Sequence, residues 1–148
     1  MIPGSSPGGE AIKHAPGHCL QRPPASIIKL VYCLTKRDDI DPDSFYLYWL
    51  EEHGPLVKSV AEAIGASRSV LSHTILPELN ELMIESRGLQ APYDGVTEVW
   101  WETMSALEQG MSSAAGVEAQ GKLIEDEARF IDFSRSRVFM TEEHEIFS

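Results

Sequence analysis

One histidine, His53, lies in an aromatic run on a predicted helix, and imidazole is the side chain best suited to proton transfer near neutral pH. At 3.6 residues per turn, Phe45 and Trp49 share a stripe with His53, so they would shield its ring from water. We therefore interpret His53 as a candidate catalytic acid or base. The alternative is a core histidine that only hydrogen-bonds a backbone carbonyl.

Aromatic residues form a second group of candidates, because large rings with one polar end suit a flat hydrophobic ligand. The candidates for substrate binding are Tyr32, Tyr48, Trp49 and Trp100. Trp100 and Trp101 are adjacent in a predicted strand, so they point to opposite faces and only one can line a given cavity. Structural packing alone would also explain either tryptophan.

His73 and Glu98 are further candidates for substrate binding, each with a structural alternative. His73 lies between Leu71 and Ile75 on one face of a predicted strand, so it could form an acid and base pair with His53. If that face does not line the pocket, His73 faces a dimer partner or solvent. Glu98 shares the face of Trp100, and its alternative is a solvated glutamate at the sheet edge.

Metal and cofactor motifs are weak or absent in this sequence. His14, His18 and Cys19 are possible metal ligands, but they lie in a segment that is not expected to hold a fixed geometry. The range 116–123 resembles a phosphate-binding loop as far as Lys122, yet Leu123 replaces the hydroxyl that would hold magnesium. No Gly-x-Gly-x-x-Gly or Cys-x-x-Cys occurs. We therefore expect no metal site and no bound cofactor.

The chain divides into a short tail and one domain. Residues 1–25 hold five of the nine prolines and four of the eleven glycines, with few residues to bury, which predicts a disordered N-terminal tail. Residues 26–148 are long enough for one core and too short for two ordinary domains.

Strand and helix patterns alternate along the domain in the order β-α-β-β-α-β. Strands are expected at 27–34, 68–76, 96–103 and 137–140, and helices at 42–64 and from about 112 to 131. Asp41 and Pro42 favour a helix start, and Pro55 predicts a kink directly after His53. The range 78–89 is ambiguous.

This element order is typical of the ferredoxin-like class of α+β folds, a four-stranded antiparallel sheet with both helices on one face. The strands carry apolar residues on both faces, so the uncovered face needs a partner. A second copy of the chain would supply one, which predicts a homodimer that pairs as an α+β barrel.

Charge and hydropathy exclude several classes of partner. The 23 acidic and 12 basic side chains give a formal charge of −11, which repels nucleic acid and anionic lipid. The longest nearly apolar stretch, Ile27 to Leu34, is far shorter than a bilayer requires. The N-terminus lacks the apolar core of a secretory signal, so we expect a cytoplasmic protein.

Three spaced elements resemble the EthD family. Tyr48-Trp49 through His53-Gly54-Pro55-Leu56 is similar to the family's Y-W-x-x-x-H-G-P-L element. The ranges 93–100 and 141–144 follow in the family's order, so the resemblance spans about Lys29 to Phe147. It implies a dimeric α+β barrel with a pocket between the sheet and the helices.

The family takes its name from an accessory protein of ethyl tert-butyl ether degradation, and its relatives include cyclases, decarboxylases and monooxygenase-like proteins that act on polyketide or aromatic compounds. The resemblance therefore implies a small-molecule enzyme or accessory protein that acts on a hydrophobic compound without a bound cofactor. An enzyme of this kind would be a cofactor-independent oxidoreductase or a lyase or cyclase. The alternatives are a non-catalytic carrier of a hydrophobic small molecule and a dimeric scaffold with a filled core.

Overall fold

The computed structural model describes residues 27–148, so the expected tail and the possible metal ligands His14, His18 and Cys19 lie outside the described residues. The elements in chain order are β1 (Ile28–Leu34), α2 (Pro42–Tyr48), the π-helical turn η2 (Trp49–His53), α3 (Gly54–Val60), β2 (Arg68–His73), α4 (Pro77–Arg87), β3 (Gly95–Trp101), α5 (Met104–Ser112), α6 (Ala114–Glu127), the 3-10 turn η3 (Phe133–Arg135) and β4 (Arg137–Glu142).

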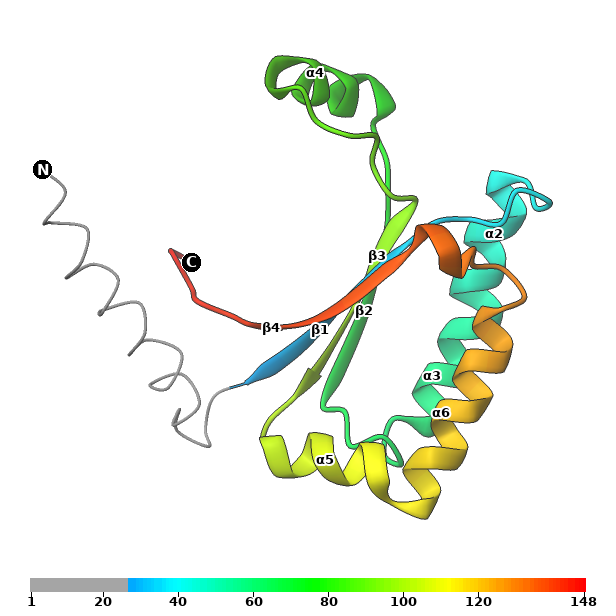
Figure 1. Ribbon diagram of the computed structural model, residues 1–148, viewed down its shortest axis with the longest axis vertical. Coiled ribbons are helices and arrows are strands. Elements are labelled where there is room, and N and C mark those ends of the chain that lie inside the picture. The colour runs from blue at the N-terminus through cyan, green and yellow to red at the C-terminus, as the bar shows by residue number, and fades with distance from the viewer. Residues whose placement is uncertain (1–26) are drawn as a thin grey trace, which may run out of the picture.

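The four strands form one antiparallel sheet in the order β2-β3-β1-β4. Helices α3 and α6 run side by side along one face of this sheet, and none of the helices in residues 27–148 covers the opposite face (Figure 1). This arrangement confirms the predicted ferredoxin-like fold. Within residues 27–148 no helix is both long and apolar enough to cross a bilayer.

Strand register divides the side chains between the two faces. Tyr32 is paired with Thr97, and Leu30 with Val99, and these four side chains line the space beneath the helices. Because successive strand residues alternate, Val31 and its partner Glu98 belong to the opposite face, which we call the free face.

The core lies between the sheet and the helices, in two clusters. One cluster is centred on Phe45, Trp49 and Phe130, each at most 1% exposed, and the other joins α3 to α6. The predicted stripe of Phe45, Trp49 and His53 is therefore the buried face of its helix.

The first helix begins as predicted and is interrupted close to the predicted place. Asp41 accepts a hydrogen bond from the Ser44 amide at 2.8 Å. Pro55 has no amide hydrogen to donate to the helix, and the backbone widens into a π turn in which Gly54 N–H bonds to the Trp49 carbonyl. The irregularity thus ends at His53 and does not follow it.

The second helical region begins earlier than expected. Thr103 caps α5 and Ser113 caps α6, so two helices replace the one expected from about residue 112. A Cβ built on Gly110 would lie 1.9 Å from the Ile64 carbonyl oxygen, so only glycine allows this close approach. The range 116–123 lies within α6, a helix and not a phosphate-binding loop.

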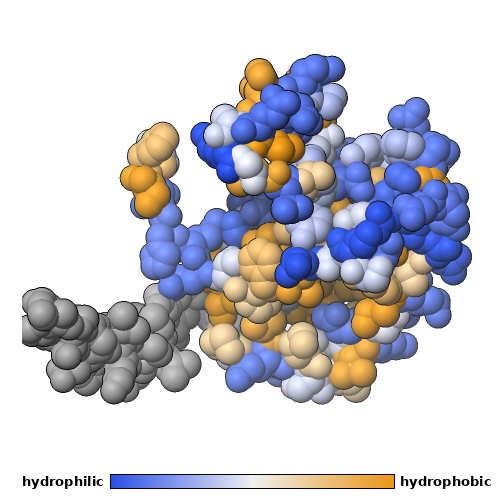
Figure 2. All heavy atoms as spheres, turned by 45° about the horizontal axis from the view of Figure 1, so that its top comes forward, coloured by the Kyte–Doolittle hydropathy of each residue, from blue (hydrophilic) through white to orange (hydrophobic). Residues whose placement is uncertain are grey.

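The ambiguous range 78–89 is largely helix α4, which projects away from the sheet and the other helices (Figure 1). Its side chains Leu79, Leu82 and Met83 are at least 43% exposed. Apolar side chains are accordingly visible on this projection in the space-filling view (Figure 2).

Candidate functional site

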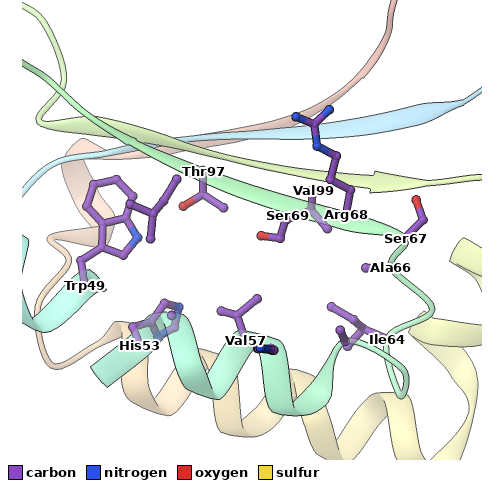
Figure 3. Close-up of a pocket in the computed structure, with 14 residues that line it drawn as sticks. Trp49, His53, Val57, Ile64, Ala66, Ser67, Arg68, Ser69, Thr97 and Val99 are labelled. Carbon is purple, nitrogen blue, oxygen red and sulfur yellow. The ribbon is translucent and has the colours of Figure 1, made fainter. Parts of the chain in front are cut away.

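Two adjoining cavities lie between the sheet and the helices. The first, of about 310 Å³, reaches towards β2, and the second, of about 260 Å³, reaches towards α6; we call them the β2-side and α6-side chambers. Both chambers are lined by Trp49, His53, Val57, Ile64, Thr97 and Val99. His53 and Val57 rise from the helix towards Thr97 and Ser69 on the strands, with the cavity between them (Figure 3).

The polar groups of the two chambers differ. The β2-side chamber has hydroxyl groups from Ser67 and Ser69 and the long cation Lys58 at its wall, whereas the Arg68 guanidinium points away from the cavity and lies over the Trp100 ring (Figure 3). The α6-side chamber is lined mainly by aliphatic and aromatic residues, and its polar lining adds Tyr32, Gln120 and Glu127. The α6-side chamber therefore combines an apolar surface with a few convergent ionisable groups, as ligand sites do.

His53 is held in one orientation at the centre of this site. The π turn brings it to the buried side of the helix, where it is 6% exposed. Its Nδ1 lies 2.7 Å from Asp126 Oδ2, so Nδ1–H donates to the carboxylate and Nε2 is left as the basic nitrogen. Within residues 27–148, Nδ1 is the only His53 ring nitrogen with a hydrogen-bond partner.

Burial lowers the pKa of His53 below its ordinary value of 6.5, and the hydrogen bond and charge of Asp126 oppose this effect. The imidazole is therefore neutral at pH 7. A neutral, oriented imidazole beside a cavity can accept a proton, and Asp126 would stabilise the imidazolium that forms.

Asp126 is a site residue that the sequence did not indicate. The Tyr48 hydroxyl donates to Asp126 Oδ1 at 2.5 Å, and Arg129 Nε lies 3.6 Å from the same oxygen. Burial and this hydrogen bond raise the pKa of Tyr48 to about 12. Tyr48 therefore positions the carboxylate and does not line either chamber.

Glu127 is the second residue that the sequence did not indicate. The Tyr32 hydroxyl donates to Glu127 Oε1 at 3.1 Å, and both side chains line the α6-side chamber. Burial, with a smaller contribution from the charge of Asp126, raises the pKa of Glu127 to about 7 against the opposing effect of the Tyr32 hydrogen bond. Burial also raises the pKa of Tyr32.

The predicted candidates are only partly brought together. Trp49 and Tyr32 line the cavity with His53, whereas His73 stacks on Tyr46 and Trp49, with ring centroids 4.6 and 5.1 Å apart. His73 lines neither chamber, so it does not form the expected pair with His53. Its Nε2 is buried without a partner among the described residues, and burial lowers its pKa.

Glu98 and Trp100 lie on the free face, so the expectation that they bind substrate in this cavity does not fit their placement. The adjacent Trp101 points the other way and lines the α6-side chamber, where its Nε1 donates to the Ile64 carbonyl at 2.7 Å. A shift of the strand register by one residue would exchange the faces of these two tryptophans, so the register decides which of them lines the chamber.

Within residues 27–148, no group of three or more histidine, cysteine, aspartate or glutamate side chains could hold a metal ion.

The EthD domain profile matches residues 37–134. No curated protein matches the sequence significantly.

Solved structures with a similar chain path include an EthD family protein from Bacillus halodurans, which is 14% identical with a TM-score of 0.55 over 80% of this chain and 99% of that one. A hydroxynitrile lyase from Passiflora edulis is 9% identical with a TM-score of 0.54, over 85% of this chain and 100% of the other. A dimeric ferredoxin-like protein from Thermobifida fusca is 12% identical with a TM-score of 0.50, over 80% and 92%. At these identities the likeness shows the fold alone.

Proposed function

Because the chain belongs to the EthD domain family, we propose that it is a small-molecule enzyme that moves protons on a hydrophobic compound, with His53 as the general base and no bound cofactor. The reaction class that fits best is that of a lyase or cyclase, since the site offers groups that carry protons. Membership of the family supports a role with a small molecule, and the geometry of the site supports catalysis.

The observation that carries this proposal is the oriented imidazole. The packed histidine His73 also has an Nε2 without a partner among the described residues, but His73 lines neither chamber and its Nε2 is enclosed. His53 instead gives Nδ1–H to Asp126 and has no protein partner for Nε2 among the described residues, beside two chambers that it lines. This combination favours a base over a packing residue.

The lining favours a flat, largely apolar substrate. Trp49 and Trp101 offer ring surfaces, and the aliphatic side chains of Val57 and Ile64 lie nearby. A chamber of about 260 Å³ suits a molecule of a few fused or linked rings, which agrees with an aromatic or polyketide-like compound.

We also propose that the protein is a homodimer formed through the free face. Phe139 on this face is 49% exposed, and Val31, Val70 and Val96 are half-buried on the same side. A second copy would cover these residues, and the similar Thermobifida fusca protein is described as dimeric. A cytoplasmic location remains the prediction from the sequence.

The test uses a ketone whose α-hydrogens exchange with solvent when a base removes them. Purified protein is incubated with 2-tetralone in D₂O, and loss of the α-proton signal is followed by NMR. His53→Ala should slow exchange by about 10² to 10⁴-fold, the usual contribution of a positioned general base. Asp126→Asn should also slow it, because the asparagine no longer fixes the tautomer or stabilises the imidazolium.

Binding of the same ketone separates catalysis from carriage. Isothermal titration of wild type and His53→Ala should give similar affinities if His53 acts on the bound compound. Wild-type protein that binds 2-tetralone but exchanges its protons no faster than His53→Ala would contradict the enzyme and support the alternative, a carrier of hydrophobic small molecules.

A further inference from the structure

The α6-side chamber has ionisable groups on two sides. His53 comes from the π turn, Glu127 from the last residue of α6, and Tyr32 from β1. A reaction that only removes a proton needs one of these groups. Removal of a proton by His53 alone would therefore leave the Glu127 carboxyl group in the same chamber without a function.

No cation lines this chamber among the described residues, and the nearest described partner of Glu127 is the neutral Tyr32 hydroxyl. Glu98 on the free face shows the usual alternative, since its carboxylate lies 2.8 Å from Lys29 Nζ. Tyr32 donates to Oε1, which leaves Oε2 free of hydrogen bonds within residues 27–148. A carboxyl in this setting favours its neutral form, with the proton available on Oε2.

The electrostatics agree with this geometry. The pKa of Glu127 is raised to about 7, mainly by burial, so the carboxyl is largely protonated below that pH. Three ionisable groups face it: Tyr32 from β1, Asp126 from α6 and His53 across the chamber. Strand β4 contributes only Val138 to this chamber.

We propose that Glu127 is the catalytic acid opposite the His53 base, and that the substrates of this chamber are ketones that can enolise. The inference rests on the proposed function, because it takes His53 as the base. His53 Nε2 takes a proton from the carbon beside the carbonyl, and the C–H electron pair forms the C=C bond of the enol. The carbonyl oxygen takes the Glu127 proton. Return of both protons restores the ketone, so no oxidant or reductant is needed.

The acid also defines the substrate more narrowly. A bound ketone would place its carbonyl oxygen at Glu127 and its α-carbon at His53, with the rest of the molecule against the apolar walls. Aromatic and polyketide-like ketones have this pattern of a polar carbonyl on an apolar frame. Ligands without an enolisable carbonyl should bind without reacting.

The test follows exchange of the α-protons of 2-tetralone in D₂O across pH. The wild-type kcat should rise as His53 loses its proton and fall above about pH 7 as Glu127 loses its own. Glu127→Gln should lower kcat by about 10²-fold or more with KM nearly unchanged, and its profile should lack the alkaline fall. Glu125→Gln, the same change on an exposed position of α6, is the matched control and should behave as wild type.

A second variant keeps the proposal testable if Glu127→Gln folds poorly. The Tyr32 hydrogen bond lowers the Glu127 pKa, so Tyr32→Phe should move the alkaline fall to higher pH. An unchanged rate and alkaline fall in Glu127→Gln, together with an inactive His53→Ala, would overturn the acid while leaving the base. Full activity of His53→Ala would overturn the proposed function itself, and no exchange by wild type would overturn the ketone assignment.

Discussion

Carboxylates on the two faces of the sheet have different kinds of partner, cations on the free face and a neutral hydroxyl on the helix face. On the free face, Lys29 Nζ lies 2.8 Å from Glu98 and 3.4 Å from Glu143, and Glu143 also accepts a hydrogen bond from Trp100 Nε1 at 2.8 Å. The Arg68 guanidinium covers the Trp100 ring at 4.5 Å. On the helix face, the Tyr32 hydroxyl is the only hydrogen-bond partner of Glu127 within residues 27–148.

The difference lies in whether a charge is neutralised by another charge. The free face pairs each of these carboxylates with Lys29, and Trp100 is buried beneath the cations at 8% exposure. The helix face leaves Glu127 to become neutral by binding a proton, and leaves His53 neutral by losing one. Burial raises the pKa of Glu127 to about 7 and lowers the pKa of His53, so burial favours the neutral form of both helix-face groups, whereas an ion pair favours the charged forms.

The largest effect expected from this contrast is a pH-dependent change in stability at Glu127. Its pKa is about 7 in the folded protein and 4.5 in a model peptide, so the folded state binds more protons between these values. The free energy of unfolding should therefore fall as pH rises from about 4.5 to 7. Glu127→Gln should remove this fall and gain about 2 to 3 kcal/mol relative to wild type between pH 5 and 8.

Urea unfolding of both proteins at pH 5 and pH 8 measures this difference, and the comparison cancels other titrating groups. The control is Glu98→Gln, which removes a carboxylate that pairs with Lys29 on the free face. A Glu127→Gln protein that follows the wild-type pH dependence would show that the helix-face carboxylate is neutralised by a partner, as on the free face.

A smaller effect is expected from the free face, in assembly and not in folding. Phe139→Glu places a charge on the apolar surface proposed to meet a second copy, so the dissociation constant of the dimer should rise tenfold or more, about 1.4 kcal/mol. Wild type should sediment at twice the 16.4 kDa chain mass at micromolar concentration.

The adjacent Val138 provides a control on the same strand. It is 55% exposed, but it lines the α6-side chamber on the helix face. Val138→Glu should therefore leave sedimentation unchanged and weaken binding of the ketone. A Phe139→Glu dimer as tight as wild type would mean that the copies meet elsewhere.

Sequence reasoning succeeded where the information is local. The spacing of Phe45, Trp49 and His53 is four residues, so one helical period places all three on the buried stripe. The cap at Asp41 likewise depends on hydrogen bonds within a single turn.

The rest of the site depends on contacts between distant segments. Asp126 lies 73 residues from His53 along the chain, so the helix expected from about residue 112 did not by itself place this carboxylate beside the imidazole. Glu127 and Tyr32 are 95 residues apart. Trp100 was chosen over Trp101 because only the sheet register decides which of two adjacent side chains faces the helices.

The smallest effect is expected at Lys29, and it tests whether the Lys29–Glu98 ion pair on the free face is partly exposed to solvent. Lys29→Met keeps the aliphatic stem near Trp100, whose ring centroid is 5.4 Å from Nζ, and removes the charge that pairs with Glu98. A double-mutant cycle with Glu98→Gln, made in the Phe139→Glu background at a concentration where the chain is monomeric, should give a coupling energy of about 0.2 to 1 kcal/mol, as for partly exposed ion pairs. The coupling should weaken further in 1 M salt, where the Debye length is about 3 Å. Coupling above about 2 kcal/mol that persists in salt in this monomeric background would instead mean that the ion pair is desolvated within the single chain.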